Sequence, residues 1–539
     1  PKKRLPRNKR ASKTTAAPAP VKQRVSPPKQ QSSSSQQNGL QADQISKFDE
    51  RERRLFSFMF PPKLKDQNGN LFDSPKYDPT TLLLPKTFPK SFTSTDGTQH
   101  KISPGQQQWW RFKAAHFDAI LLFKMGKFYE MYEMDAHVGV KELGLIYMKG
   151  EQPHAGFPEK NYQKNAETLA RNGHKVVMIE QTETPAMLAE RKKKDARCKD
   201  TVVRREKIAV VTRGTMIDRV MVESCPDASH VLAISEFPSG KEGRSSFHIG
   251  VCAAECAAGK FVLGAYNVVP GNGDEETLSS LRTTLCELNP VEIIFRRDEM
   301  DSNKFPGPAV AAALRDCVPN AHIRYVCSSK ITSSECVKEE VEKQGYFKPL
   351  AAYPDVIETF FSSANNANAE AALVAFGTCL LYLNDNLVAH DVVPYGKYET
   401  IANDETFLGM EGSVVDSSAP PSPSDMKREA TTKRLQFKDA FMRMDAAALS
   451  GLEILENTEG GKLGTLLELV SRAASAPGMR VLRMQCCRPS CDTSVIRSKQ
   501  NAIEALRSND AVDTFQKVRA LLKASPDYER CVARCVGSG

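Results

Sequence analysis

The stretch LLFKMGKFYEMYEMDAHVGVKELGL, residues 121–145, passes from a strand pattern to a helix pattern. An apolar run ends at Met125, and a glycine and a lysine follow it. Apolar side chains then recur every three or four residues, which is typical of one face of a helix. We therefore predict a strand over residues 118–125 and a helix over residues 135–143.

Between these two elements lies the triplet Phe128, Tyr129 and Glu130, flanked by Lys124 and Lys127. An aromatic ring and a carboxylate two residues apart are most often a core residue and a surface residue. The same two groups can instead contact a ligand that is both aromatic and polar, such as a base pair, while lysines beside them neutralise phosphate charge. The residues alone leave both interpretations open.

The sequence around the triplet predicts a mixed α/β domain over residues 106–218. A helix is expected to start at Trp109 and Trp110, and HKVVMIEQ at 174–181 has the β-branched composition of a strand. The following TPAMLAERKKK predicts a helix with Thr184 as N-cap and a proline in its first position.

Residues 228–400 predict a second α/β domain. Two apolar strand patterns meet at Gly259, which indicates a hairpin. A helix pattern stopped by Pro290 is followed by the strand pattern VEIIFRR, so this part contains a strand–helix–strand unit. The apolar AEAALVAFGTCLLYLNDNLV, residues 369–388, predicts a long helix.

The other segments differ from these domains in composition. Residues 1–50 are rich in Pro, Ser, Gln and Lys and cannot bury enough apolar surface to fold, so we expect a disordered basic arm. Residues 51–105 contain many prolines and predict an extended lead-in. Residues 412–433 predict a flexible insertion, and helix-period patterns fill residues 436–539.

Composition limits the location and the partners of the protein. The net charge is +9, and the unopposed basic residues at the N-terminus fit a polyanionic partner. PKKRLPRNKR, residues 1–10, resembles a nuclear localisation signal. No signal-peptide core is present, and the longest apolar run is too short to cross a bilayer. We therefore expect a nuclear protein without membrane contact, whose fourteen cysteines are reduced thiols.

No pattern predicts a catalytic or metal site in this chain. Three C-x3-C pairs fall within or beside strand and helix patterns, so we interpret them as ordinary thiols rather than zinc ligands. These pairs are Cys252 and Cys256, Cys487 and Cys491, and Cys531 and Cys535. There is no G-x4-G-K-[ST] phosphate loop, no G-x-S-x-G motif and no carboxylate pattern typical of a two-metal nuclease.

The opening stretch resembles the mismatch-binding motif of the MutS family of DNA mismatch repair proteins. FKMGKFYEMYEMDA (123–136) is similar to the family's apolar strand, Phe-x-Glu triplet and following acidic helix. The resemblance is strongest to the eukaryotic branch that keeps this triplet. SPKYDPTTLLLP (74–85), MRMDAAALSGLEILEN (442–457) and SPDYERCVARCVGSG (525–539) resemble further segments of the family, in the same order.

The resemblance implies roles for the residues around the triplet. Phe128 would enter the minor groove and stack on a mispaired base, and Glu130 would contact the displaced base. Glu130 would do so as a protonated carboxyl if burial and nearby phosphates raise its pKa. Lys124 and Lys127 would contact the DNA backbone, and Met125 would fill space beside the ring.

The resemblance also implies the identity of each domain. Residues 106–218 would be the mismatch-binding domain I, residues 228–400 an RNase H-like connector domain II without a nuclease centre, and residues 436–539 the beginning of the helical core and lever domain III. The family's ATPase, with its ATP and Mg²⁺, would lie beyond this chain, which is itself expected to hold no cofactor. One departure from the family is Ser475-Ala476-Pro477-Gly478, where Thr-Pro would be expected.

The partners that the resemblance implies are mismatched double-stranded DNA, a second MutS homologue in a heterodimer, and MutL-type proteins. ERRLFSFMF (52–60) has the spacing of a sliding-clamp box, in which Leu55 and Phe58 would contact the replication clamp. The same residues suit the lead-in, which is the interpretation we favour. The alternative function is a non-enzymatic interaction fragment that binds DNA poorly. A third possible function is a nuclease that acts through the connector domain.

Overall fold

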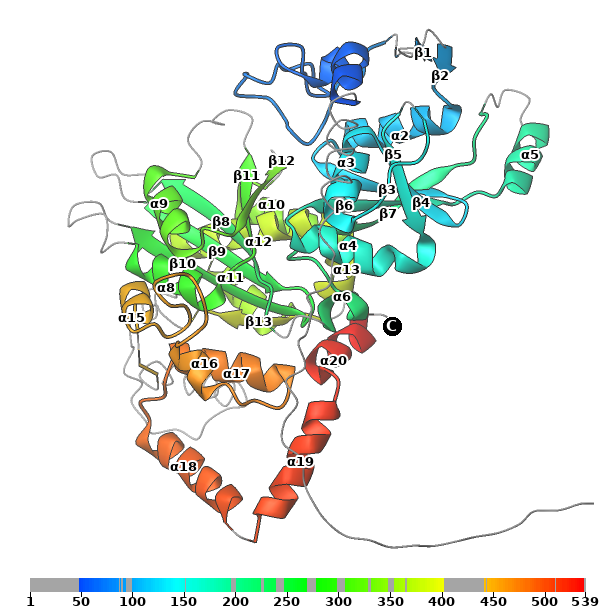
Figure 1. The fold of residues 1–539 in the computed structure, drawn as a ribbon. Helices are drawn as coiled ribbons and strands as arrows, with labels where there is room; N and C mark the ends of the chain where they lie inside the picture. The colour runs from blue at the N-terminus through cyan, green and yellow to red at the C-terminus, as the bar shows by residue number, and fades with distance from the viewer. Residues whose placement is uncertain are drawn as a thin grey trace, which may run out of the picture. The chain divides into compact units, whose positions relative to one another are not determined.

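The computed structural model describes the chain with several gaps. The residues described are 48–86, 88, 91–93, 99–150, 152–194, 200–223, 227–238, 247–268, 278–297, 306–327, 331–347, 353–363, 366–401, 441–442, 444–508 and 510–537. The chain divides into two units, residues 1–51 and 52–539, and the second holds the elements labelled in Figure 1. The predicted basic arm, except residues 48–50, and the predicted insertion at 412–433 lie outside the described residues.

A five-stranded sheet forms the base of the first domain, with the strand predicted at 118–125 in its centre (Figure 1). In spatial order the strands are β5 (His154–Pro158), β4 (Phe128–Tyr132), β3 (Ala119–Met125), β6 (Lys175–Gln181) and β7 (Arg205–Val211). The central strand β3 pairs with β4 in antiparallel and with β6 in parallel orientation, and the outer strands β5 and β7 run antiparallel to their neighbours. The strands predicted at 118–125 and 174–181 are confirmed.

Alternating side chains of β3 serve both faces of this sheet, because successive residues of a strand point to opposite sides. Ile120 and Leu122 join one core, which also contains side chains of α3 (Glu133–Leu143) and α4 (Tyr162–Arg171). Leu121 and Phe123 join the other core, to which α2 (Pro104–Ala115) contributes Trp109 and Trp110. The predicted helix at 135–143 is confirmed, whereas the helix of the tryptophans begins earlier than expected, at Pro104 behind the N-cap Ser103.

The lead-in packs into the same core as α2. Phe56 is fully buried, with its ring centroid 4.7 Å from that of Trp110, and Leu82 is buried in the same cluster. Regular structure in the described part of the lead-in comprises the helical residues 51–55, η1 (Ser57–Met59) and the antiparallel pair β1 (Ser91–Thr93) and β2 (Gln99–Lys101). Residues 51–105 are therefore mostly irregular but contribute apolar side chains to the first domain.

A buried ion pair ties α2, β3 and α3 together. Lys113 Nζ lies 2.7 Å from Asp135 Oδ1, and the two side chains are 2% and 0% exposed. The second carboxylate oxygen of Asp135 accepts a hydrogen bond of 2.9 Å from the backbone N–H of Leu121. Burial raises the pKa of Asp135, although Lys113 and the Leu121 N–H act in the opposite direction.

The helix predicted after Thr184 is also present. Helix α5 (Pro185–Lys194) begins with a proline, and the Thr184 hydroxyl accepts a hydrogen bond of 3.2 Å from the backbone N–H of Met187. Helix α6 (Arg219–Glu223) follows β7.

A six-stranded sheet forms the second domain, and strand–helix–strand units flank its hairpin. Its strands, in spatial order, are β12 (His322–Cys327), β11 (Glu292–Arg297), β8 (Val231–Pro238), β9 (Phe247–Glu255), β10 (Lys260–Val268) and β13 (Lys397–Thr400). Strand β9 runs antiparallel to both of its neighbours, β8 and β10, whereas β11 runs parallel to β8 and β12 parallel to β11. The predicted hairpin at Gly259 and the predicted strand after Pro290 are confirmed.

Helices cover both faces of this second sheet (Figure 1). One core contains side chains of α8 (Ser279–Leu288) and α9 (Pro308–Cys317), and the other is dominated by α12 (Ala367–Asp385). The second face also receives α10 (Ser334–Gln344), α11 (Asp355–Ser362) and α13 (Ala389–Val392). The long helix predicted at 369–388 is thus confirmed as a mostly buried helix that ends three residues earlier.

The C-terminal portion is helical, as predicted. Its helices are α15 (Ala446–Gly451), α16 (Leu466–Val470), α17 (Ala476–Cys487), α18 (Thr493–Arg507), α19 (Val512–Ala524) and α20 (Tyr528–Gly537). Ser475 caps α17 by accepting a hydrogen bond from the Gly478 N–H, and Pro477 lies in the first turn, where backbone N–H groups have no partner within the helix. None of the helices in the described part of the chain is long and apolar enough to cross a bilayer.

Candidate nucleic-acid interface

Strands β3 and β4 form a hairpin with a two-residue turn at Gly126 and Lys127. Gly126 has a φ of +60°, which a glycine adopts at little cost in the first position of such a turn. The Gly126 N–H donates to Gln181 Oε1 at 3.1 Å, and the Lys127 carbonyl accepts from the Glu159 N–H at 2.9 Å. The turn is therefore held from both sides by neighbouring segments.

Phe128 lies directly after this turn and is 45% exposed. Its partner across the hairpin is Met125, and Glu130 follows on the same face of β4, because side chains two residues apart in a strand share a face. The structure thus brings Met125, Phe128 and Glu130 together on one face. Sequence reasoning placed Met125 beside the ring, and the pairing register agrees with that position.

Glu130 is half-buried and bound by two neighbours on this face. The Tyr132 hydroxyl donates a hydrogen bond to Glu130 Oε2, and His154 Nε2 lies 3.1 Å from the same oxygen. The His154 ring stacks on Tyr132 with 4.5 Å between centroids and 11° between planes. The carboxylate is therefore fixed in position before any ligand is bound.

The neighbours of Glu130 lower its pKa in the chain without DNA. Burial alone would raise the pKa of Glu130, but the hydrogen bonds from His154 and Tyr132 and the positive charge of Arg205 outweigh it and hold the pKa below its usual value. Glu130 is therefore an ionised carboxylate at neutral pH when DNA is absent. Its protonation beside the phosphates of bound DNA stays a prediction.

Gly156 on β5 provides the space that Glu130 occupies. The two residues are paired across β4 and β5. A Cβ atom at Gly156 would lie 2.9 Å from the Tyr129 carbonyl oxygen and 3.4 Å from Glu130 Cγ. Any larger residue at this position would displace the backbone of β4 or the carboxylate side chain.

Arg205 on the edge strand β7 contacts the end of β3 on the same face of the sheet as Glu130. Its Nε donates to the Lys124 carbonyl at 2.9 Å, and its Nη2 lies 3.0 Å from Met125 Sδ. The guanidinium group also lies 4.6 Å from the centroid of the Phe123 ring. Because Arg205 is only 8% exposed, its role is to position the hairpin rather than to meet a phosphate.

Lys124 lies on the opposite face of the hairpin from Phe128. Its Nζ is 2.6 Å from Glu159 and 3.4 Å from Glu180, and it lies 4.7 Å from the centroid of the Tyr129 ring. Burial would lower the pKa of Lys124, but its contacts with the two carboxylates raise it. The ammonium group is already neutralised within the domain, so of the two predicted backbone contacts the exposed Lys127 is the better placed.

The predicted clamp-contacting residues pack against the first domain. The Phe58 ring centroid lies 6.0 Å from that of Trp110, and Leu55 is a partly buried member of the same apolar cluster. Both side chains already have apolar neighbours, which supports the interpretation of residues 52–60 as lead-in.

Sequence reasoning missed Tyr132, His154, Gly156 and Arg205. Tyr132 could have been found, because it follows Glu130 by two residues and therefore shares its face. His154, Gly156 and Arg205 come from strands that are remote in sequence, and no local pattern connects them to Glu130.

The cysteine pairs and the connector carboxylates offer little for metal binding. Cys252, Cys256 and Cys487 are buried, whereas Cys491 and Cys535 are exposed. Within the described part of residues 228–401, no three His, Cys, Asp or Glu side chains lie close enough together to hold a metal ion.

Comparison with known proteins identifies the family. Residues 103–220 match the model of MutS domain I, and residues 447–538 match the model of MutS domain III. The chain belongs to the MutS family. The hairpin with Phe128 and Glu130 thus falls within the part that matches domain I.

Individual MutS-family relatives match over nearly the whole chain. The DNA mismatch repair protein MSH6 of Arabidopsis thaliana is 34% identical over 93% of this chain and 35% of its own length. The human DNA mismatch repair protein Msh6 is 30% identical over 88% of this chain and 33% of its own length. The bacterial DNA mismatch repair protein MutS of Rhodopseudomonas palustris (strain HaA2) is 26% identical over 80% of this chain and 39% of its own length. The chain spans about a third of the length of the curated relatives first matched.

Proposed function

We propose that this chain recognises mismatched double-stranded DNA in post-replicative mismatch repair, as one subunit of a heterodimer with a second MutS homologue. Phe128 enters the minor groove and stacks on a mispaired base, and Glu130 contacts the displaced base. The observation that carries the proposal is a large aromatic side chain, 45% exposed, directly after a tight turn that is hydrogen-bonded on both sides.

A contact of this kind favours mismatched DNA because a mismatched duplex is easier to deform than a matched one. Stacking of a base on an aromatic ring contributes about 1–3 kcal/mol. Bending the duplex costs about 1–6 kcal/mol, and unstacking a base step costs a few kcal/mol more. On matched DNA the two costs together exceed the gain from stacking. A mismatched pair is already poorly stacked, so the cost falls there while the gain from Phe128 remains.

Glu130 serves this mechanism as a prepositioned hydrogen-bond acceptor. An ionised carboxylate cannot donate, so it selects a base edge that offers an N–H group. Tyr132 and His154 act as positioning residues, because they hold the carboxylate beside Phe128. Lys127 in the turn is exposed and contributes phosphate attraction.

The remaining assignments concern the connector domain and the location, partners and cofactors of the whole protein. The strand order β10-β9-β8-β11-β12, with three antiparallel strands followed by two parallel ones, supports an RNase H-like connector. We further propose a nuclear location and contacts with MutL-type proteins. We also propose that ATP and Mg²⁺, which the resemblance implies for the family, are bound outside the residues of this chain.

Binding to matched and mismatched duplexes tests the proposal. Fluorescence anisotropy with G·T and G·C duplexes, in the presence of the second MutS homologue, compares the parent with Phe128→Ala. Loss of stacking should reduce affinity for the G·T duplex roughly 5- to 100-fold, with little change for G·C. Phe441→Ala is the matched control, because Phe441 is 47% exposed in the C-terminal portion.

Two results would count against the proposal. Unchanged discrimination in Phe128→Ala would remove the aromatic ring from the mechanism. A parent chain that binds both duplexes equally weakly, even with the partner present, would favour the interaction fragment instead.

A further inference from the structure

Two cysteines of the connector domain line a cavity that the proposed function does not use. Residues of the C-terminal portion, among them Leu449 and Arg483, line the same cavity. Helices α8 and α9 pack side by side on one face of the six-stranded sheet. Cys286 on α8 and Cys317 at the end of α9 are both half-buried and both line a cavity of about 590 Å³. The two thiol groups lie close enough for each to affect the pKa of the other.

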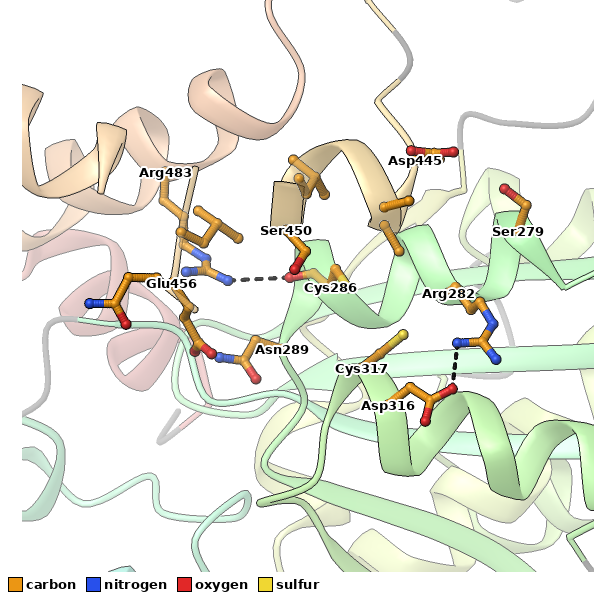
Figure 2. A pocket seen from close by; sticks show the side chains of 15 residues that line it. Ser279, Arg282, Cys286, Asn289, Asp316, Cys317, Asp445, Ser450, Glu456 and Arg483 are labelled. Atoms are coloured by element: carbon orange, nitrogen blue, oxygen red, sulfur yellow. Dashed lines mark hydrogen bonds and ion pairs between the residues drawn. The ribbon is translucent and has the colours of Figure 1, made fainter. Parts of the chain in front are cut away.

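An arginine completes the group. Arg282 lies one helical turn before Cys286, and residues four apart share a face of a helix. Its guanidinium group forms an ion pair of 2.8 Å with Asp316, the residue before Cys317 (Figure 2). The side chain therefore places positive charge next to one of the two sulfur atoms.

These neighbours make the two thiols chemically unequal. The neighbouring Cys286 thiol and the charge of Arg282 lower the pKa of Cys317 to about 7, although burial and Asp316 oppose the shift. The neighbouring Cys317 and burial raise the pKa of Cys286. The C-terminal end of α9 is an unfavourable place for an anion, so the Arg282 side chain and the Cys286 thiol are what stabilise the thiolate.

We propose that Cys317 and Cys286 form a peroxide-sensitive dithiol, in which Cys317 is the attacking thiolate and Cys286 the resolving thiol. The Cys317 thiolate attacks one oxygen of a hydroperoxide, so that an S–O bond forms and the O–O bond breaks. The hydroxide that leaves takes up a proton and becomes water. The Cys286 thiol then attacks the sulfenic sulfur, the S–S bond forms, and a second water leaves with the Cys286 proton.

The balance of this step is two thiols and one hydrogen peroxide giving one disulfide and two waters. Two electrons pass from the sulfur atoms to the peroxide. The product joins α8 covalently to α9. The cavity gives the oxidant access to both sulfur atoms, and the ion pair between Arg282 of α8 and Asp316 of α9 joins the two helices beside them.

Peptide mapping of the full chain tests the proposal. The reduced protein is treated with hydrogen peroxide, the remaining thiols are blocked, and disulfides are identified by mass spectrometry without reduction. We expect a Cys286–Cys317 disulfide as the first product. A first product that joins Cys286 to Cys487, which also lies near Cys286, would overturn the proposal, as would oxidation confined to the exposed Cys491 and Cys535.

Alkylation kinetics and two variants provide the independent measurement. At pH 7 a thiol with a pKa of about 7 is about half ionised, roughly sixteen times more than an ordinary thiol, but each thiolate is several times less nucleophilic. Cys317 should therefore react with iodoacetamide about threefold faster than an ordinary thiol of equal access, with Cys531, which is half-buried like Cys317, as the internal comparison. Cys286→Ser should leave a Cys317 sulfenic acid that dimedone traps, and Cys317→Ser should abolish the disulfide. Rapid peroxide oxidation of Cys286 in Cys317→Ser would contradict the assigned roles.

Discussion

Replacement of Lys113 by methionine tests how the first domain supports the hairpin. Lys113 Nζ and Asp135 Oδ1 are 2.7 Å apart, and neither side chain is more than 2% exposed. Lys113→Met leaves the Asp135 carboxylate buried without its counter-charge, between α3 and the strand that leads to the turn. Breaking a buried pair in this way costs about 3–5 kcal/mol, far more than the loss of a surface pair.

The chain offers a built-in probe for this measurement. Its only two tryptophans, Trp109 and Trp110, lie on α2 one turn from Lys113 and are 0% and 1% exposed. Intrinsic fluorescence in urea therefore follows the first domain alone. With a dependence of about 2 kcal/mol per molar urea, a loss of about 4 kcal/mol lowers the unfolding midpoint by about 2 M.

Two variants separate charge from side-chain volume. Lys113→Met combined with Asp135→Asn removes the unpaired charge and keeps an acceptor for the Leu121 N–H, so about half of the lost stability should return. Lys175→Met is the matched control, because Lys175 and Asp118 form a partly exposed pair at 3.5 Å, and it should cost less than about 1 kcal/mol. A midpoint shift below about 0.5 M in Lys113→Met, or no recovery in the double variant, would refute the reasoning.

Three further predictions concern the hairpin itself. Gly126→Val forces a β-branched residue to a φ of +60°, so it should lower the free energy of unfolding, measured by tryptophan fluorescence, by about 1–2 kcal/mol. It should also weaken G·T binding more than G·C binding, and unaltered affinity for the mismatch would show that the turn geometry is unimportant. Glu130 has a lowered pKa in the folded chain, so its contribution to stability is present above its unfolded value of about 4.3 and is lost as pH falls through the folded value. Glu130→Gln should therefore be less stable than the parent at neutral pH. It should also lose less stability than the parent on acidification to about pH 3. If the free energies of unfolding of the two proteins changed in parallel with pH, the stabilising role of the hydrogen-bonded carboxylate would be contradicted. The parent's preference for G·T over G·C should not change between pH 6 and pH 8, and a preference that falls as pH rises would instead show that DNA binding protonates Glu130.

The sequence by itself determined the local elements around the site. The strand up to Met125, the glycine turn and the helix after Asp135 follow from periodicity and turn chemistry, which act between residues close in the chain. The same holds for the Gly259 hairpin and for the Thr184 cap. The resemblance of residues 123–136 to the MutS family pointed to Phe128 and Glu130 for the same reason, because both side chains lie within one short motif.

Tertiary structure decided the state of the side chains in that motif. Glu130 is ionised because His154 from β5 and Tyr132 bind its carboxylate, and Lys124 is neutralised because Glu159 and Glu180 come from other elements. The pairing of Cys286 with Cys317 depends in the same way on two helices that pack on one sheet. Apart from the local contact between Tyr132 and Glu130, each of these contacts joins residues that are more than 22 positions apart in the sequence. The electrostatic energy of a group depends on which charges and dipoles surround it in space. No local periodicity records that arrangement.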